Sequence, residues 1–139
     1  MILSIVDSMD DIKKKSLDLH KKYKGKLAVK SKVRIETRED LTLAYTPGVA
    51  AVSDAISKNI ELAYDYTMKA NSIAVVSDGS AVLGLGNIGA EAALPVMEGK
   101  AVLFKEFADI DAFPICLRTQ DEKDIVNIVK NIAPAFGGI

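Results

Sequence analysis

The chain has 139 residues, of which 49% are hydrophobic and 27% charged. That is enough for one hydrophobic core and one globular domain. Its 18 basic and 19 acidic side chains give a net charge of -1, which lacks the positive field that nucleic-acid binders use. One cysteine and one histidine cannot build a structural zinc site, and no apolar run approaches the roughly 20 residues that cross a bilayer. We therefore expect a cytoplasmic protein that binds neither nucleic acid nor membranes.

The N-terminal part of the chain is predicted to be a helix followed by an extended connector. Residues 10–23 place apolar side chains along one stripe and lysines elsewhere, which indicates an amphipathic helix. His20 lies among these lysines and is expected at the surface. Residues 24–40 alternate apolar and basic side chains without a helical period, which favours an extended segment.

Two short helices are predicted next, separated by a break at a proline. Thr37 and Asp40 have the spacing of a capping box, and Pro47 interrupts the helix that they begin. Residues 47–58 then form a second helix, because proline is tolerated in a first turn. The side chains expected to be buried on this second helix are Val49, Val52 and Ile56. Tyr45 lies at the break, where it can project its hydroxyl group.

The second half of the chain alternates strand and helix signals. Strands are predicted at 73–77, 81–83 and 111–117. Helices are predicted at 89–97, 100–108 and 121–132, with Pro95 kinking or ending the first and a capping pattern of Thr119 with Glu122 before the last. The fold class is therefore α/β: one domain with a short, mainly parallel sheet flanked by helices and preceded by an N-terminal helical segment.

The segment from Gly84 to Gly89 (GLGNIG) has the GxGxxG spacing of a dinucleotide-binding loop. In such a loop the pyrophosphate rests on a helix N-terminus, and an acidic residue at the end of the next strand binds the ribose. Here the acidic residues at that distance, Asp109 and Asp111, lie at the start of the next predicted strand. We therefore favour a glycine-lined turn that lets the backbone approach a substrate or another helix, and keep a dinucleotide site as the alternative.

Two side chains could carry proton-transfer chemistry. Lys100 follows Glu98-Gly99 among apolar residues, and desolvation of a lysine favours the neutral form that acts as a base. Judged from its neighbours alone, Lys100 is better explained as a surface lysine at a helix start. Tyr45 could act as a general acid through its hydroxyl, or could simply pack beside Pro47. Lys105 lies near acidic residues on an ordinary solvated helix face, and Cys116 is expected to be a core thiol.

Three segments resemble the N-terminal domain of bacterial-type malic enzymes. They read DLTLAYTPGVA at 40–50, NSIAVVSDGSAVLGLGNIGAEAALPVMEGKAVLFKEFADIDAF at 71–113 and PAFGGI at 134–139. The resemblance implies NAD(P)-dependent oxidative decarboxylation of L-malate to pyruvate and CO2, with a Mg or Mn ion. It also implies that residues 37–139 form the substrate domain, and that residues 1–36 are a helix and connector that serve dimerisation, so that a homodimer is expected.

The resemblance assigns roles to individual residues. It implies that Tyr45 is the general acid in the enolpyruvate step and that Lys100 is the general base on the malate hydroxyl. It also implies that the loop with Gly84, Gly86, Asn87 and Gly89 lines the active-site cleft, while the nucleotide binds to a separate domain. Ala81 stands where the animal-type enzymes carry a malate-binding arginine, as in shorter bacterial forms.

The family pattern continues beyond PAFGGI with acidic metal ligands and then the NAD(P)-binding domain. We therefore expect no cofactor or metal ligands among these 139 residues, and no malate turnover by them alone. An alternative of another class is a stand-alone interaction module that dimerises and pairs with a separate nucleotide-binding chain.

Overall fold

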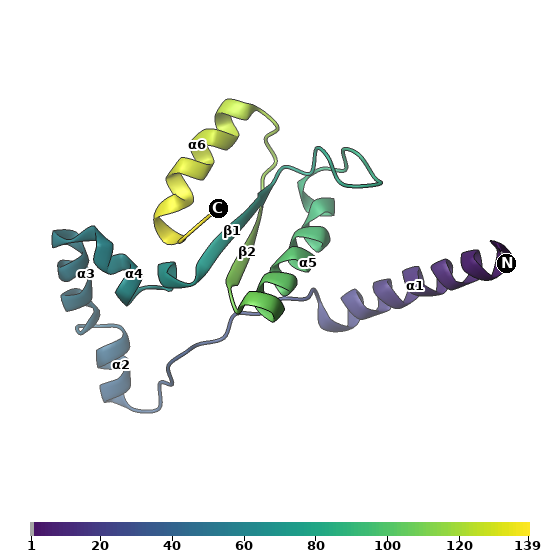
Figure 1. Ribbon diagram of the computed structural model, residues 1–139. Coiled ribbons are helices and arrows are strands. Elements are labelled where there is room, and N and C mark those ends of the chain that lie inside the picture. The colour runs from purple at the N-terminus through teal and green to yellow at the C-terminus, as the bar shows by residue number, and fades with distance from the viewer. Residues whose placement is uncertain (1) are drawn as a thin grey trace.

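A computed structural model describes residues 2–139, with the side chains described from residue 9 onward. The longer elements are, in chain order, α1 (Ile2–Tyr23), α2 (Arg38–Ala44), α3 (Val49–Lys58), α4 (Ala63–Tyr66), β1 (Ser72–Ser77), α5 (Ala90–Ala108), β2 (Asp111–Cys116) and α6 (Glu122–Ile132) (Figure 1). Single turns of 3-10 helix, Ile60–Leu62, Met68–Ala70 and Ala133–Ala135, connect some of them. The predicted α/β class is confirmed.

A parallel pair of strands forms the centre of the fold. β1 and β2 run side by side in register from Ser72 opposite Asp111 to Ser77 opposite Cys116. The end of the chain adds a short parallel contact on the other edge of β1, where the Ala74 amide donates to the Gly138 carbonyl over 3.0 Å. Figure 1 shows the two strands between α5 on one side and α6 on the other. Both strands predicted from short apolar runs, at 73–77 and 111–117, are confirmed within one residue at each end.

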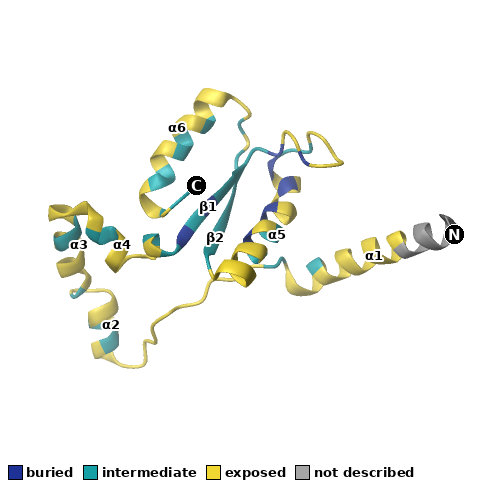
Figure 2. Cartoon of the chain, viewed as in Figure 1, coloured by how far each residue is buried: buried dark blue, intermediate teal, exposed yellow. Residues whose placement is uncertain are grey.

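The core lies where α5 packs against the two strands. The buried side chains belong mainly to one stripe of this helix, and they are Ala90, Ala93, Met97 and Ala101, together with Ala74 on β1. Three of the four on the helix are alanines, and these small side chains let this part of α5 lie close to the sheet. Figure 2 shows this burial concentrated on α5 and β1.

The prediction of two helices between residues 89 and 108 is wrong, because α5 is continuous from Ala90 to Ala108. Pro95 lies inside α5, and Gly99 causes no break. The local helix-breaking tendency of these residues amounts to a few kcal/mol. The continuous buried stripe against the sheet outweighs this cost.

Two further local predictions are also wrong. Residues 81–83 form no strand, because Val82 pairs with Gly86 inside its own loop instead of with β1. The cap of α6 is Asp121, whose side chain accepts from the Asp124 amide over 3.0 Å, and the Thr119–Glu122 box is absent. Thr119 instead donates to the Asp124 carboxylate over 3.1 Å.

The N-terminal half is much more exposed than the sheet region (Figure 2). The helix predicted at 10–23 is confirmed but begins earlier, at Ile2, and the connector after it is extended as predicted. The capping box of Thr37 and Asp40 at the start of α2 is confirmed. α3 begins at Val49, two residues after Pro47, and its predicted buried side chains remain partly or largely exposed. Among residues 2–139, no helix is long and apolar enough to span a bilayer.

Candidate functional site

The glycine-rich loop, residues 78–89, follows β1 and leads directly into α5. Its first part is a tight turn in which the Val82 amide donates to the Gly86 carbonyl over 2.8 Å and the Gly86 amide donates back over 2.9 Å. Gly84, Gly86 and Gly89 all have positive φ angles, between 74° and 79°. An added Cβ at any of the three would meet nothing within 4 Å. These glycines are therefore required by backbone conformation, not by a close neighbour in this chain.

The close backbone approach expected of this motif occurs at Gly79 instead. The Gly79 carbonyl accepts from the amides of Ile88 and Gly89, over 3.0 and 3.3 Å. A Cβ on Gly79 would lie only 2.0 Å from the Gly89 carbonyl oxygen. Gly79 thus ties the end of β1 to the N-terminus of α5. The sequence showed it only as part of an Asp-Gly turn.

The geometry of the sheet opposes a dinucleotide site on this loop. A ribose-binding acid would have to follow the carboxyl end of β2, beside the loop. The residues that follow Cys116 there are Leu117, Arg118, Thr119 and Gln120, none of which is acidic. Asp111 lies at the opposite end of β2, where Lys105 binds it over 3.0 Å. Hydrogen bonds from Lys105 and Asn71 lower the pKa of Asp111.

Polar pairs join the glycine-rich loop and α5 to the segment after β2. Asn87 and Gln120 exchange two amide hydrogen bonds of 3.0 Å. Arg118 donates to the Glu91 carboxylate in the first turn of α5, over 2.9 Å from Nε. The backbone amide of Glu91 and the Arg118 guanidinium together lower the pKa of Glu91. Asn87, which the family resemblance assigns to the active-site cleft, is therefore held by a partner from the segment after β2.

Lys100 lies in the middle of α5, not at a helix start, and its side chain is exposed. Its helix face also carries the residues four before, three after and seven after it. These are Val96, Leu103 and Phe107, and Phe107 is 84% exposed. The desolvation expected of Lys100 is therefore not supplied by the described part of this chain. Lys105 is exposed on the helix, as predicted, and its hydrogen bonds to the carboxylates of Asp109 and Asp111 raise its pKa.

Tyr45 lies at the junction of α2 and α3, where its amide donates to the Leu41 carbonyl over 2.9 Å. Its side chain is 67% exposed, so the hydroxyl is free to project, as predicted. The structure does not bring Tyr45 and Lys100 together, because α2 and α3 lie well apart from α5 (Figure 1). Within one chain, these two residues cannot act on one small substrate in this arrangement.

The other candidate residues occupy ordinary positions, with one exception. Cys116 is partly buried at the end of β2, and burial is the main reason that its pKa is raised. Ala81 is exposed in the glycine-rich loop. His20, expected at the surface, is instead partly buried and lies 2.7 Å from the Lys26 ammonium.

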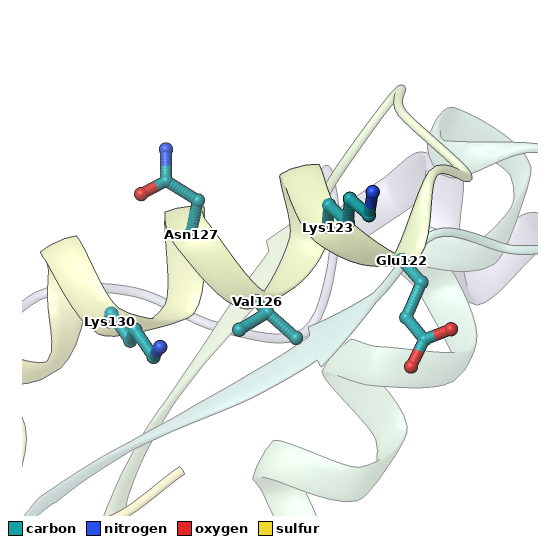
Figure 3. Close-up of a pocket in the computed structure, with 5 residues that line it drawn as sticks. All are labelled: Glu122, Lys123, Val126, Asn127 and Lys130. Carbon is teal, nitrogen blue, oxygen red and sulfur yellow. The ribbon is translucent and has the colours of Figure 1, made fainter.

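A shallow pocket of about 360 Å³ lies along α6 (Figure 3). Its lining residues all come from this one helix, and they are Glu122, Lys123, Val126, Asn127 and Lys130. None of the candidate catalytic residues lines it. Within residues 2–139, no three His, Cys, Asp or Glu side chains are grouped as a metal site would require.

A comparison with models of known protein families shows which family has this sequence pattern. Residues 23–133 match the family model described as "Malic enzyme, N-terminal domain". The chain belongs to the malic enzyme family. The match includes both Tyr45 and Lys100 and the whole of the glycine-rich loop.

Relatives and solved structures of the malic enzyme family agree with this assignment. The chain is 59% identical over 128 residues to the bifunctional malic/malolactic enzyme of Bacillus subtilis, covering 92% of this chain and 31% of that protein. It is 63% identical over 115 residues to the NAD-dependent malic enzyme of Geobacillus stearothermophilus, covering 83% and 24%. It resembles the crystal structure of the NAD-dependent malic enzyme of Thermotoga maritima with a TM-score of 0.86 and 58% identity, covering 88% and 35%. The chain thus spans about a third or less of the length of these relatives.

Proposed function

We propose that this chain supplies the substrate-binding and proton-transfer residues of a malic enzyme that converts L-malate to pyruvate and CO2. The observation that carries the proposal is the family match over residues 23–133, which holds the AYTPG, GLGNIG and MEGK segments in order. The nearby relatives are named malic enzymes, some NAD-dependent and others NADP-dependent. A nicotinamide cofactor is therefore the proposed hydride acceptor.

Neither the cofactor nor a divalent metal fits the side chains that the structure describes, those of residues 9–139. The glycine-rich loop lacks the ribose-binding acid, and the described residues contain no metal-ligand group. We infer that both groups are held by the part of the relatives that this chain does not cover. The roles below are accordingly those of this chain's own residues.

Lys100 is the proposed general base. Its neutral Nζ would accept the proton of the malate hydroxyl while the carbon that carries this hydroxyl is oxidised to a ketone. An exposed lysine is protonated at neutral pH and cannot do this. The role therefore requires that the apolar face around Lys100 be covered, which would remove water from the ammonium group.

Tyr45 is the proposed general acid. After CO2 has left, its hydroxyl would donate a proton to the carbon of the enolpyruvate, giving the methyl group of pyruvate. This step requires the Tyr45 hydroxyl to reach the same substrate molecule as Lys100. Since the two residues lie apart within one chain, a second chain is needed to bring them together.

We infer a homodimer in which Tyr45 of one chain and Lys100 of the other complete one site. The support comes from two exposed apolar faces. One surrounds Lys100 on α5, where Leu103 is 56% exposed, and the other surrounds Tyr45 on α2, where Leu43 is 68% exposed. Burying one against the other would cover both apolar faces and desolvate Lys100 in the same step.

The test uses a chimera in which this chain replaces the matching segment of the Geobacillus stearothermophilus enzyme. Lys100→Ala is expected to reduce malate oxidation by at least about a hundredfold, as for the loss of a general base. Lys105→Ala, on the same helix but paired with Asp109 and Asp111, is the matched control and is expected to retain activity. Full activity of the Lys100→Ala chimera would contradict the assigned role.

A stand-alone dimerisation module that pairs with a separate nucleotide-binding chain remains the second candidate. The exposed apolar side chains of α1, such as Ile12 and Leu19, favour self-association of this chain. Sedimentation over a range of concentrations tests the self-association that both candidates require. A chain that stays monomeric at all concentrations would contradict both this candidate and the proposed homodimer.

A further inference from the structure

The end of α1 is joined to the middle of α5 by a small cluster of polar contacts. After α1, Lys24 and Gly25 adopt positive φ angles of 55° and 103°, and the Gly25 amide donates to the His20 carbonyl over 3.2 Å. This turn brings Gly25 against Glu98, so closely that an added Cβ would lie 2.8 Å from the Glu98 carboxylate. The φ of 103° favours glycine at this position, whereas the flexible Glu98 side chain could move aside from a Cβ.

Lys26, the next residue, makes three contacts at this junction. Its backbone amide donates to Glu98 Oε2 over 3.2 Å, and its Nζ donates to the Pro95 carbonyl of α5 over 2.7 Å. The same Nζ lies 2.7 Å from Nε2 of His20. Lys26 thus bridges the last turn of α1 and the turn of α5 that precedes Lys100.

These contacts fix the protonation of His20. Its Nδ1 lies 2.7 Å from the Ser16 carbonyl oxygen, which can only accept a hydrogen bond. Nδ1 must therefore carry the proton. Nε2 faces the Lys26 ammonium, which can only donate, so Nε2 must present its lone pair. The geometry requires the neutral Nδ1–H tautomer.

We propose that His20 and Lys26 form a positioning latch that holds α1 against α5 beside Lys100 and that closes only while the His20 ring is neutral. A protonated ring would carry a hydrogen on Nε2 and point it at the three hydrogens of Lys26, so that donor would face donor and cation would face cation. The latch rests on the contacts above. Its consequence for catalysis rests on the proposed role of Lys100.

Charged groups near His20 belong to three elements, and one of them contacts the ring. Lys26, from the connector, is in direct contact and disfavours a second positive charge. Glu98, from α5, contacts Gly25 and the Lys26 amide rather than the ring, and its negative charge favours a second positive charge nearby. Lys21 and Lys22 follow His20 in the last turn of α1, and the C-terminal end of the helix dipole favours a cation there. The hydrogen bond that protonation breaks is the one from Lys26, so that contact decides whether the latch stays closed.

The latch can be tested on this chain by ¹⁵N NMR of the imidazole, since His20 is its single histidine. Histidine without a partner prefers its proton on Nε2. The latch predicts that the neutral ring carries its proton on Nδ1 at about pH 8, and that the Lys26 amide signal moves together with the ring as it becomes protonated. A neutral ring with its proton on Nε2 would overturn the proposal, whatever any variant does.

Substitutions show whether Lys26 is responsible. Lys26→Met removes the donor to Nε2 and is expected to shift the ¹⁵N resonance of Nε2, while the Ser16 carbonyl still favours the Nδ1–H tautomer. Lys14→Met, which removes the same charge from an exposed position on α1, is expected to leave the Nε2 resonance in place. An unchanged Nε2 resonance in Lys26→Met would overturn the latch.

The positioning role is measured separately in the malic enzyme chimera. Lys26→Met is expected to lower kcat by about tenfold, as for a misplaced catalytic helix, without changing KM for the nicotinamide cofactor. If the NMR result holds but kcat is unchanged, the latch positions α1 alone and the positioning role is overturned. If the parent chimera has no malate activity while the tautomer is as predicted, the proposed function fails and the latch stands.

Discussion

Gly79→Ala tests the tight junction between β1 and α5 most sharply. Two costs arise at this position. The residue has a φ of +71°, and this left-handed conformation costs an alanine about 1–2 kcal/mol. In addition, the new Cβ would lie 2.0 Å from the Gly89 carbonyl oxygen, and forcing extra volume into such a place costs about 1–3 kcal/mol. The expected loss in the free energy of unfolding is therefore about 2–5 kcal/mol.

Gly84→Ala is the matched control, because Gly84 has a φ of +79° and nothing within 4 Å of an added Cβ. It is expected to lose only the conformational cost of about 1–2 kcal/mol. The reduction in unfolded-state entropy on going from glycine to alanine is the same in both variants and cancels. Urea unfolding followed by circular dichroism measures the difference. Equal losses in the two variants would refute the close approach of Gly79 to Gly89.

Three further predictions concern local contacts. Thr37→Ala removes the capping box of α2 and is expected to lower the free energy of unfolding by about 1 kcal/mol; an unchanged urea midpoint would count against the cap. Hydrogen bonds from Thr37 and Glu36 lower the pKa of Asp40 below 3.8, so the stabilisation from this carboxylate is present above that pH and lost as the pH falls through the lowered value. NMR titration of Asp40 should show the lowered pKa, and Thr37→Ala should move it upward. Lys69→Met removes the ammonium group that donates to the carbonyls of Ala133, Pro134 and Phe136 and is expected to cost about 2–3 kcal/mol, whereas Lys58→Met, at an exposed ion pair with Asp54, should change the unfolding midpoint little.

The strands and most helices could be predicted because their signals are local. The apolar runs that became β1 and β2 and the cap at Thr37 depend on neighbours within a few residues. The continuity of α5 could not be predicted in this way. Pro95 and Gly99 are local breaking signals, and the packing of Ala93, Met97 and Ala101 against the sheet overrides them.

The residues of the candidate site could be predicted from the sequence, but their arrangement in space could not. Tyr45 and Lys100 were named from the motifs around them, yet their separation depends on where α2 and α3 lie relative to α5 (Figure 1). His20 shows the same limit. Its sequence neighbours are mostly lysines, whereas its deciding contact is with Lys26, which reaches it only because Gly25 turns the chain back.

The central claim is that one site takes Tyr45 from one chain and Lys100 from another. Chimeras carrying Tyr45→Phe and Lys100→Ala, each inactive alone, would be co-expressed in equal amounts and assayed for malate oxidation. Random pairing makes half of the dimers mixed, each with one intact shared site, so activity should return to about a quarter of the unmodified level. If both residues of a site came from the same chain, every site in every dimer would lack one of them. Activity that stays at the level of the separate variants would contradict the account.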